Sequence, residues 1–390
     1  MGSRPIVCEL FAGVGGLTLG AVRAGFDVRV AVELDVRAAR AHLRNFPKSV
    51  VLQKDVSTLV AADLFSAAKV SQGGIDGIIG GPPCQGFSTI GRRHPNDVRN
   101  NLFAHFFRLV AEVQPKFFVA ENVPGILEAR FASDVEAAIA PVRDKYRIIG
   151  PLTLKASDFG APTSRTRVVF IGFRTTGTDS QTSSPSFLLA PNGEPVVVQA
   201  ALRGLPREAP DWRDVPGGRV RLHSVRETPF LKKVMDARPP GVGDVDVCRL
   251  LERGIVLGHQ GTVHSEELLR RYEALNPGQQ DPITKSVRLI ANGFCPTLRA
   301  GTGPERGSFQ AVRPIHFNKP RVITPREAAR LQSFPDWFVF DQTKWHSFRQ
   351  IGNSVPPLLA EAFLLEVMHC LAHTRTAKLR AKNQSAFGSD

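Results

Sequence analysis

One cysteine of the chain lies on a loop built from glycine and proline. The segment Gly80-Gly-Pro-Pro-Cys-Gln-Gly-Phe-Ser88 follows an apolar run that is typical of a buried strand. Two prolines stiffen the approach to Cys84, and a rigid loop position favours a nucleophilic thiol. The alternative is an inert buried cysteine, which fits Cys8 inside the first apolar run better than this loop. A zinc deaminase would need a second cysteine three residues later, where Phe87 stands.

Acidic and basic side chains accompany two later apolar runs. Glu121-Asn-Val123 comes directly after the run 116–120. A carboxyl group that holds a proton at this place can donate it to a ring nitrogen of a substrate. Arg165 and Arg167 precede another apolar run, and residues two apart in an extended segment face the same side. The alternative for both motifs is a surface ion pair.

A glycine-rich turn, Phe11-Ala-Gly-Val-Gly-Gly16, joins the first apolar run to a helical pattern. Glycines there let the backbone approach a ligand closely at a helix N-terminus. The dinucleotide fingerprint needs a further glycine where Thr18 stands, which argues against an NAD oxidoreductase. Glu33 ends the second run, where an acid commonly binds ribose hydroxyls, and Asp35 is the competing candidate. Asp55 closes the third run and could meet an adenine edge; a solvated loop acid is the alternative.

These candidates all stand at the ends of predicted strands. Apolar runs alternate with helical patterns, which predicts an α/β fold with a mostly parallel sheet and helices on both faces. Ligands bind at the carboxyl ends of such strands, so we expect the candidates to meet at one edge of the sheet. The predicted strands are Pro5–Leu10, Val28–Val32, Val50–Leu52, Gly77–Ile79, Lys116–Ala120 and Val168–Gly172; the predicted helices are Leu17–Ala24, Val36–Asn45, Leu102–Val113, Asp134–Arg143, Pro325–Gln332 and Pro356–Leu371.

The composition divides the chain. After the predicted sheet domain 1–181, residues 182–335 are rich in proline, glycine and arginine, without clean alternation of strands and helices. We expect this part to form a smaller, irregular second domain. The basic, polar tail 374–390 is expected to be disordered.

The charge of the chain indicates a polyanionic partner. The 390 residues carry a net charge of +14, and lysine and arginine gain affinity by displacing phosphate counterions. A basic surface kept for solubility is the alternative. Five widely spaced cysteines without a CxxC pair argue against disulfides and a structural zinc, and we expect no metal. No apolar run reaches the roughly 20 residues of a membrane span, and no signal peptide is visible. We therefore expect a cytoplasmic protein.

Taken together, the motifs resemble those of the DNA (cytosine-5) methyltransferase family of bacterial restriction-modification systems. The resemblance covers roughly residues 1–175 and 320–370, and the part between corresponds to the family's variable target-recognition domain. One departure is Thr163, where the family usually has glutamine. The matching segments, in the family's order, are Phe11–Gly16, Pro82–Gln85, Asp97–Leu102, Glu121–Val123, Arg165–Arg167, Arg326–Pro335 and Gln350–Pro356.

The resemblance implies a covalent mechanism. Cys84 would attack carbon 6 of a cytosine flipped out of duplex DNA, while Glu121 holds ring nitrogen 3. Arg165 would contact the base oxygen, with Arg167 beside it, and Asn122 would brace the Pro83-Cys84 turn. A methyl group would pass from S-adenosylmethionine to carbon 5, leaving S-adenosylhomocysteine as the product.

The resemblance also implies the binding residues and a Rossmann-like methyltransferase sheet. Residues 336–373 would return to the catalytic domain and close the cofactor site. The implied cofactor-binding residues are Phe11, Ala12, Gly13, Gly15, Gly16, Leu17, Glu33, Leu34, Asp55, Val56, Pro82, Asn353, Ser354 and Val355. The implied DNA-binding residues are Gln85, Ser88, Arg99, Thr297, Leu298 and Arg299.

Two alternatives belong to other functional classes. Some relatives with the same catalytic core methylate tRNA, but they usually carry a Cys-Phe-Thr element, which this sequence lacks. A paralogue that only binds DNA would be expected to have lost Cys84 or Glu121, and both are present. We expect a monomer that acts on double-stranded DNA. The target sequence, and a companion endonuclease or defence complex, stay open.

Overall fold

The computed structural model describes residues 3–83, 101–175, 187–191, 193–235, 238–301 and 313–386, with the backbone alone for residues 101 and 374–386. Four of the predicted site residues lie outside these ranges. They are the proposed nucleophile Cys84 and the DNA-binding candidates Gln85, Ser88 and Arg99.

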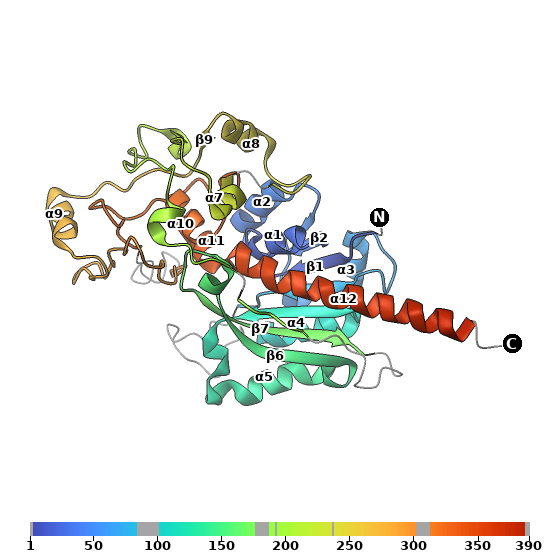
Figure 1. Ribbon diagram of the computed structural model, residues 1–390. Helices are drawn as coiled ribbons and strands as arrows, with labels where there is room; N and C mark the ends of the chain where they lie inside the picture. The colour runs from blue at the N-terminus through green and yellow to red at the C-terminus, as the bar shows by residue number, and fades with distance from the viewer. Residues whose placement is uncertain are drawn as a thin grey trace.

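A seven-stranded sheet forms the centre of the α/β part of the chain (Figure 1). Its strand order is β3-β2-β1-β4-β5-β7-β6, and β7 runs antiparallel to both of its neighbours while the other pairs are parallel. The predicted α/β class with a mostly parallel sheet is therefore confirmed. The strands are β1 (Ile6–Leu10), β2 (Asp27–Val32), β3 (Val50–Leu52), β4 (Gly77–Gly80), β5 (Phe117–Asn122), β6 (Tyr146–Lys155) and β7 (Thr166–Arg174).

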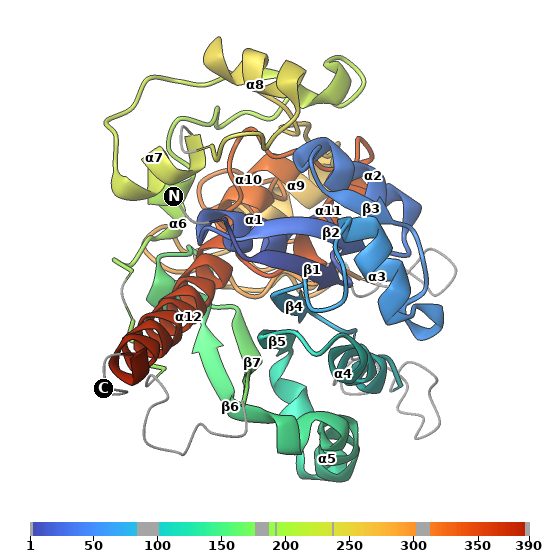
Figure 2. The same cartoon turned by 90° about the vertical axis from the view of Figure 1, so that its right-hand side faces the viewer.

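Helices cover both faces of the sheet, and Figure 2 shows α12 and α4 on opposite sides of it. Alternate residues of each strand supply the two hydrophobic cores, so Val7 packs with the α1 face and Cys8 with the α4 face. The helices around the sheet are α1 (Gly16–Arg23), α2 (Val36–Asn45), α3 (Ala61–Ala68), α4 (Asn101–Val113), α5 (Ala132–Ile139) and α12 (Pro357–Ala386). Short 3-10 turns are η1 (Val56–Thr58), η3 (Pro124–Leu127), η4 (Ala129–Phe131), η5 (Ala140–Lys145) and η6 (Ala156–Phe159).

The last helix packs against the first. A Cβ atom added to Gly20 of α1 would lie only 2.7 Å from the carbonyl carbon of Ala360, so the two helix backbones approach closely. The segment Lys344–His373 is long and apolar enough to span a membrane, but 61% of its most apolar window is buried inside the protein. This is the behaviour of a core helix, and here its partner is α1.

The middle of the sequence forms the irregular region seen above the sheet in Figure 1. It has short helices joined by long loops and a two-stranded ribbon. Its elements, with those that follow, are α6 (Val198–Ala201), η7 (Pro216–Gly218), β8 (Val220–Arg221), α7 (Pro229–Met235), α8 (Val245–Glu252), β9 (Ile255–Val256), α9 (Glu266–Ala274), α10 (Pro325–Leu331) and α11 (Lys344–Asn353).

Three features differ from the expectations. β6 was not predicted because Gly150-Pro151 interrupts its pattern; the structure accommodates this pair where the register shifts between Ile149 and Leu152, on an edge strand. Asn353, an implied cofactor-binding residue, is the last residue of helix α11, which the sequence patterns did not predict. The tail was expected to be disordered after residue 373, whereas the α12 backbone continues to Ala386.

Candidate active site

Two loops leave the carboxyl edge of the sheet side by side. β1 pairs with β4 from Val7↔Gly77 to Leu10↔Gly80, so the loop that begins at Phe11 and the loop that begins at Gly81 emerge next to each other. β1 also pairs with β2 on its other side. From β1 the chain continues to β2 and β3 on one side, and from β4 it continues to β5 on the other side, so the strand order reverses between β1 and β4. Such a switch point is where open α/β sheets bind ligands.

The glycine-rich loop takes a backbone conformation that few side chains allow. Phe11, Gly13 and Gly15 all have positive φ, of 58°, 55° and 97°. A Cβ atom on Gly16 would lie 2.5 Å from the carbonyl oxygen of Val355, so larger residues would push the loop away from the segment that follows α11. Around Gly13, in contrast, a Cβ atom would meet none of the described residues within 4 Å, so these residues leave open space on the outer side of the loop.

The carboxylate of Glu33 faces this loop. Its two oxygens accept hydrogen bonds from the backbone N–H groups of Gly13 and Asp35, each at 2.8 Å. Burial raises the pKa of Glu33, partly offset by these hydrogen bonds. The competing candidate Asp35 is otherwise engaged: its carboxylate caps the N-terminus of α2 through the N–H groups of Arg37 and Ala38. The structure therefore places Glu33, rather than Asp35, at the loop.

The other predicted cofactor residues surround the same edge. Asp55 accepts a hydrogen bond from the N–H of Ser57 at 2.8 Å, which holds its pKa below the usual value. Leu34, two residues after the end of β2, is 61% exposed. Ala12, Leu17 and Val56 are buried beneath the edge.

A buried polar cluster lies behind the loop, and it was missed from the sequence. The Thr18 hydroxyl donates to the carboxylate of Glu9 and lies 2.9 Å from Nε2 of His42, and all three side chains are buried. Burial raises the pKa of Glu9 to about 8 and lowers that of His42 to about 3. Glu9 precedes the loop and Thr18 follows it, so the cluster ties its two ends together. An acid inside the apolar run 6–10 was the signal that could have found it.

Glu121 and Arg167 form an ion pair at the neighbouring strand ends. Arg167 Nε donates to Glu121 Oε1 at 2.6 Å, and both side chains are almost fully buried. Burial raises the pKa of Glu121, while the charges of Arg167 and Arg165 act in the opposite direction. A Cβ atom on Gly81 would lie 2.7 Å from Glu121 Oε2, so the carboxylate directly touches the start of the Cys84 loop.

Asn122 contacts the same loop. Its Nδ2 donates to the carbonyl oxygen of Pro82 at 3.4 Å, and its Oδ1 accepts from the N–H of Val123 at 2.8 Å. Pro82 itself is buried. Asn122 therefore joins the end of β5 to the backbone that leads into Cys84.

The Arg165 guanidinium is hydrogen-bonded to two backbone carbonyl groups. The resemblance implied a contact with the base, but in the structure Nη1 of Arg165 donates to the carbonyl oxygen of Leu298 at 2.9 Å and Nη2 to that of Gly352 at 2.6 Å. The arginine that pairs with the carboxylate of Glu121 is Arg167. The sequence pattern could not separate the two, because both residues face the same side of an extended segment.

Thr163 contacts the segment that carries the predicted recognition residues. The Thr163 hydroxyl is buried and donates to the carbonyl oxygen of Cys295 at 3.0 Å. Two residues further on, Thr297 and Arg299 are exposed while Leu298 is buried. Thr163 thus holds the segment that leads to the DNA-binding candidates, rather than facing outward.

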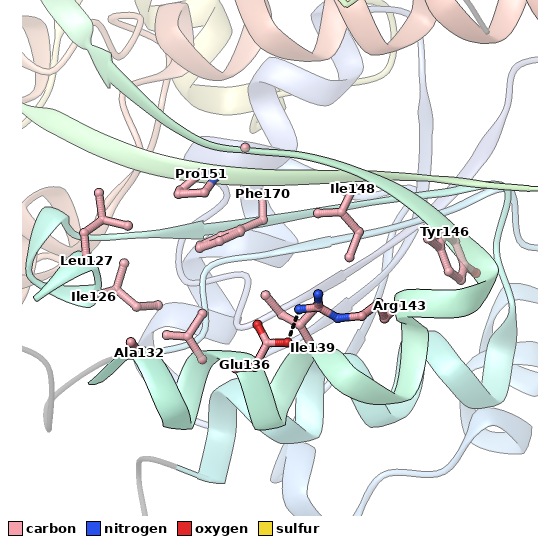
Figure 3. Close-up of a pocket in the computed structure, with 12 residues that line it drawn as sticks. Ile126, Leu127, Ala132, Glu136, Ile139, Arg143, Tyr146, Ile148, Pro151 and Phe170 are labelled. Carbon is pink, nitrogen blue, oxygen red and sulfur yellow. Dashed lines mark ion pairs between the residues drawn. The ribbon is translucent and has the colours of Figure 1, made fainter. Parts of the chain in front are cut away.

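A separate cavity of about 490 Å³ lies between α5 and the β6–β7 pair (Figure 3). Its lining is mostly apolar, including Ile126, Ile139 and Phe170, and Arg143 is paired with Glu136 at its side. None of the predicted site residues that the structure describes lines it, so it is distinct from the strand-end site. Among the described residues, no group of three or more His, Cys, Asp or Glu side chains is placed to hold a metal ion.

Comparison with known families accounts for this arrangement. The sequence profile of the family described as C-5 cytosine-specific DNA methylase matches residues 6–369. A match over almost the whole chain includes both the sheet and the irregular region. The chain belongs to the C-5 cytosine-specific DNA methylase family, and it is a DNA (cytosine-5) methyltransferase of the restriction-modification type.

Individual relatives agree with this assignment. The chain is similar to the Type II methyltransferase M.XorII of Xanthomonas oryzae pv. oryzae, with 38% identity over 95% of this chain and 86% of the relative. It is also similar to the Type II methyltransferase M1.HphI of Haemophilus parahaemolyticus, with 33% identity over 92% of this chain and 86% of the relative. The predicted family and enzyme class are confirmed.

Solved structures show the same fold. A prophage-encoded protein from E. coli, assigned as a DNA modification methyltransferase, superposes with a TM-score of 0.84 and 46% identity over 94% of this chain and 99% of that protein. The Dnmt2 methyltransferase of S. pombe superposes with a TM-score of 0.58 and 18% identity over 95% of this chain and 99% of that protein, and so supports the fold alone.

Proposed function

We propose that this methyltransferase flips its target cytosine out of duplex DNA and activates it by a covalent bond to Cys84. Carbon 5 of cytosine is a poor nucleophile, and the target atom cannot be reached inside the stacked duplex. Attack of the Cys84 thiolate on carbon 6 would form a carbon–sulfur bond and make carbon 5 nucleophilic. After methylation, loss of the hydrogen at carbon 5 would break the carbon–sulfur bond and release the thiolate. The observation that carries the proposal is the contact of Glu121 and Asn122 with the loop that leads to Cys84.

Glu121 and Arg167 would act on the flipped base. A protonated Glu121 can donate a hydrogen bond to ring nitrogen 3 and offset the negative charge that builds up when the thiolate adds. Its raised pKa favours this form. Arg167 lies beside the same carboxyl group, so we assign the contact with the base oxygen to Arg167 in place of Arg165.

The strand-end residues fit S-adenosylmethionine as the cofactor. The open space beside Gly13 leaves room for a ligand against the loop backbone, and each oxygen of Glu33 has a further lone pair for a ribose hydroxyl. The exposed side chain of Leu34 offers an apolar surface for a flat ring, and Asp55 offers an acceptor at the next strand end. When bound, the cofactor supplies an electrophilic methyl group.

DNA would bind along the irregular region and the sheet edge. The net charge of +14 supports electrostatic attraction to phosphates, and the exposed side chains of Thr297 and Arg299 stand on the segment joined to Thr163. Because DNA is the substrate, we place the protein in the bacterial cytoplasm.

Covalent trapping tests the proposal. Bisulfite sequencing of DNA from cells that express the protein first maps the methylated site. A duplex with 5-fluorocytosine at that site, incubated with S-adenosylmethionine, should then give a complex that survives denaturing electrophoresis, because fluorine at carbon 5 cannot leave as a proton does. The adduct should map to Cys84.

Cys84→Ser is the matched variant. It should form no adduct and show no methylation, while S-adenosylmethionine still binds, since the cofactor residues are unchanged. Efficient methylation of the normal site by wild-type protein, without trapping at the fluorinated one, would contradict the covalent role of Cys84.

A further inference from the structure

Arg165 joins three segments that are far apart in the sequence. Its side chain is 2% exposed, and its two hydrogen bonds reach carbonyl groups 133 and 187 residues away. Leu298 belongs to the recognition region, and Gly352 lies one residue before the end of α11. The planar guanidinium of arginine can donate to both carbonyls at once in a fixed geometry. Arg165 itself is the residue directly before β7 of the large sheet.

The recognition side of this junction is tightly packed. A Cβ atom on Gly352 would lie 2.7 Å from the backbone nitrogen of Ala300 and 2.8 Å from the carbonyl carbon of Arg299. The same segment is also attached at its other end, because the backbone N–H of Ser164 donates to the carbonyl oxygen of Cys295 at 2.9 Å. The segment 295–300 is thus fixed at both ends against the sheet and α11.

The cofactor side begins only a few residues further on. Ser354 and Val355 follow α11, and the carbonyl oxygen of Val355 lies against Gly16 at the end of the glycine-rich loop. A shift of residues 352–355 would therefore displace the contacts with both the cofactor loop and segment 295–300. Tightly packed backbone leaves little room for the two to move independently.

We propose that Arg165 is a positioning residue that couples the cofactor pocket to recognition segment 295–300. Filling the pocket fixes residues 352–355 at the end of α11, and the two hydrogen bonds of Arg165 transmit this ordering to Leu298. Through Leu298 it reaches the exposed side chains of Thr297 and Arg299. By thermodynamic reciprocity, DNA must strengthen cofactor binding by the same factor. The inference rests on the proposed function, because it takes Phe11–Gly16 as the cofactor loop and segment 295–300 as DNA-facing.

The test measures the coupling directly. The dissociation constant of a duplex that carries the mapped site is determined with and without saturating S-adenosylhomocysteine. The coupling ratio is the dissociation constant without S-adenosylhomocysteine divided by the one with it. For wild type we expect a ratio within the usual range for coupled sites, about 5–150-fold. Arg165→Lys cannot donate to both carbonyls in the planar geometry, so the ratio should fall to about one. Binding of S-adenosylhomocysteine without DNA, and trapping at saturating 5-fluorocytosine duplex, should be retained.

A second variant perturbs the same junction without changing a charge. Gly352→Ala should push segment 299–300 away from α11, and we expect it to lower the ratio in the same way. Should Arg165→Lys fail to fold, Gly352→Ala decides the question.

Arg326→Lys is the matched control. Arg326 is also buried and also donates to backbone carbonyls, those of Leu257, Pro335 and Phe338, but it makes no contact with segment 295–300 in the described hydrogen bonds. It should lower thermal stability while keeping the wild-type ratio. If Arg326→Lys also lowers the ratio to about one, the effect comes from a general loosening of the fold and the inference is wrong.

The remaining outcomes separate this inference from the proposed function. A ratio of one in wild type, or an unchanged ratio in both junction variants, overturns the coupling even if methylation and trapping succeed. Loss of the single-turnover rate at saturating DNA by Arg165→Lys, with the ratio kept, would mean that Arg165 touches the base. If wild-type protein neither methylates nor traps, the proposed function itself has failed.

Discussion

Arg167 Nε lies 2.6 Å from Glu121 Oε1, across two antiparallel strands that meet at the catalytic edge of the sheet. In the register of β5 and β7, Glu121 stands opposite Val169, two residues from Arg167 on the same side of the strand. The pairing of these strands therefore holds a buried acid beside a buried cation, at the start of the loop that carries Cys84. Burial and the cation act on the pKa of the acid in opposite directions, and burial is the larger effect.

Glu121→Gln should lower the single-turnover methylation rate by about 10²–10⁴-fold, the usual contribution of a positioned proton donor. The ratio of the wild-type rate to the Glu121→Gln rate should fall as the pH rises through the raised pKa of Glu121, because the protonated form is the donor. Ionisation of the Cys84 thiol affects both proteins, so it cancels to first order in this ratio. Rates measured across the pH range test this, with the surface variant Glu136→Gln as control. A ratio that stays constant or rises with pH over that range would contradict a protonated Glu121.

Gly81→Ala should damage catalysis through Glu121. The added methyl group would lie 2.7 Å from Glu121 Oε2, so either the carboxylate or the Cys84 loop must move. We expect a large loss of single-turnover rate with unchanged S-adenosylmethionine affinity, measured by calorimetry. Gly73→Ala, at a position with open space around the Cβ atom, is the control and should keep the rate despite some backbone strain. Equal rates for the two variants would argue against contact between Gly81 and the acid.

Glu9 should make the folded protein less stable as the pH rises. Its pKa is raised to about 8 from an ordinary value of 4.5, so the folded state keeps the proton while the unfolded state loses it. The contribution of Glu9 to the free energy of unfolding is fully present below about pH 4.5. It declines between about pH 4.5 and pH 8, by at most about 1.4 kcal/mol per pH unit. Glu9→Gln removes this decline.

Urea unfolding of wild type and Glu9→Gln at pH 5, 6.5 and 8 measures the effect. His42 and Glu33, the titratable groups near Glu9, are present in both proteins, so their contributions cancel to first order in the difference. A difference in unfolding free energy that stays constant with pH would show that Glu9 is already ionised in the folded protein.

Arg299→Ala should weaken DNA binding in a way that depends on salt. If the exposed Arg299 contacts a phosphate, its loss should reduce the slope of log affinity against log salt by about 0.9, equally for target and non-target duplexes. Fluorescence anisotropy at several salt concentrations measures both slopes. A loss confined to the target duplex would instead identify Arg299 as a base-reading residue.

Most of the sheet could be predicted because its strands are short, apolar and bounded by turn residues. β1, β2, β3, β4, β5 and β7 all lie within about two residues of their predicted bounds. β6 escaped prediction because a proline normally excludes a strand, and only its edge position and register shift made room for Gly150-Pro151. The helix α11 escaped because its residues are largely polar.

The sequence by itself determined the family, the fold class and the set of residues at the strand ends, because these depend on residue types and on spacing along one strand. The tertiary structure decided which residue of each candidate pair faces the site. Asp35 caps α2, so Glu33 faces the glycine-rich loop. Arg167 pairs with Glu121, while Arg165 turns to carbonyls of Leu298 and Gly352. Those partners lie more than a hundred residues away, and no local pattern reports contacts that only folding creates.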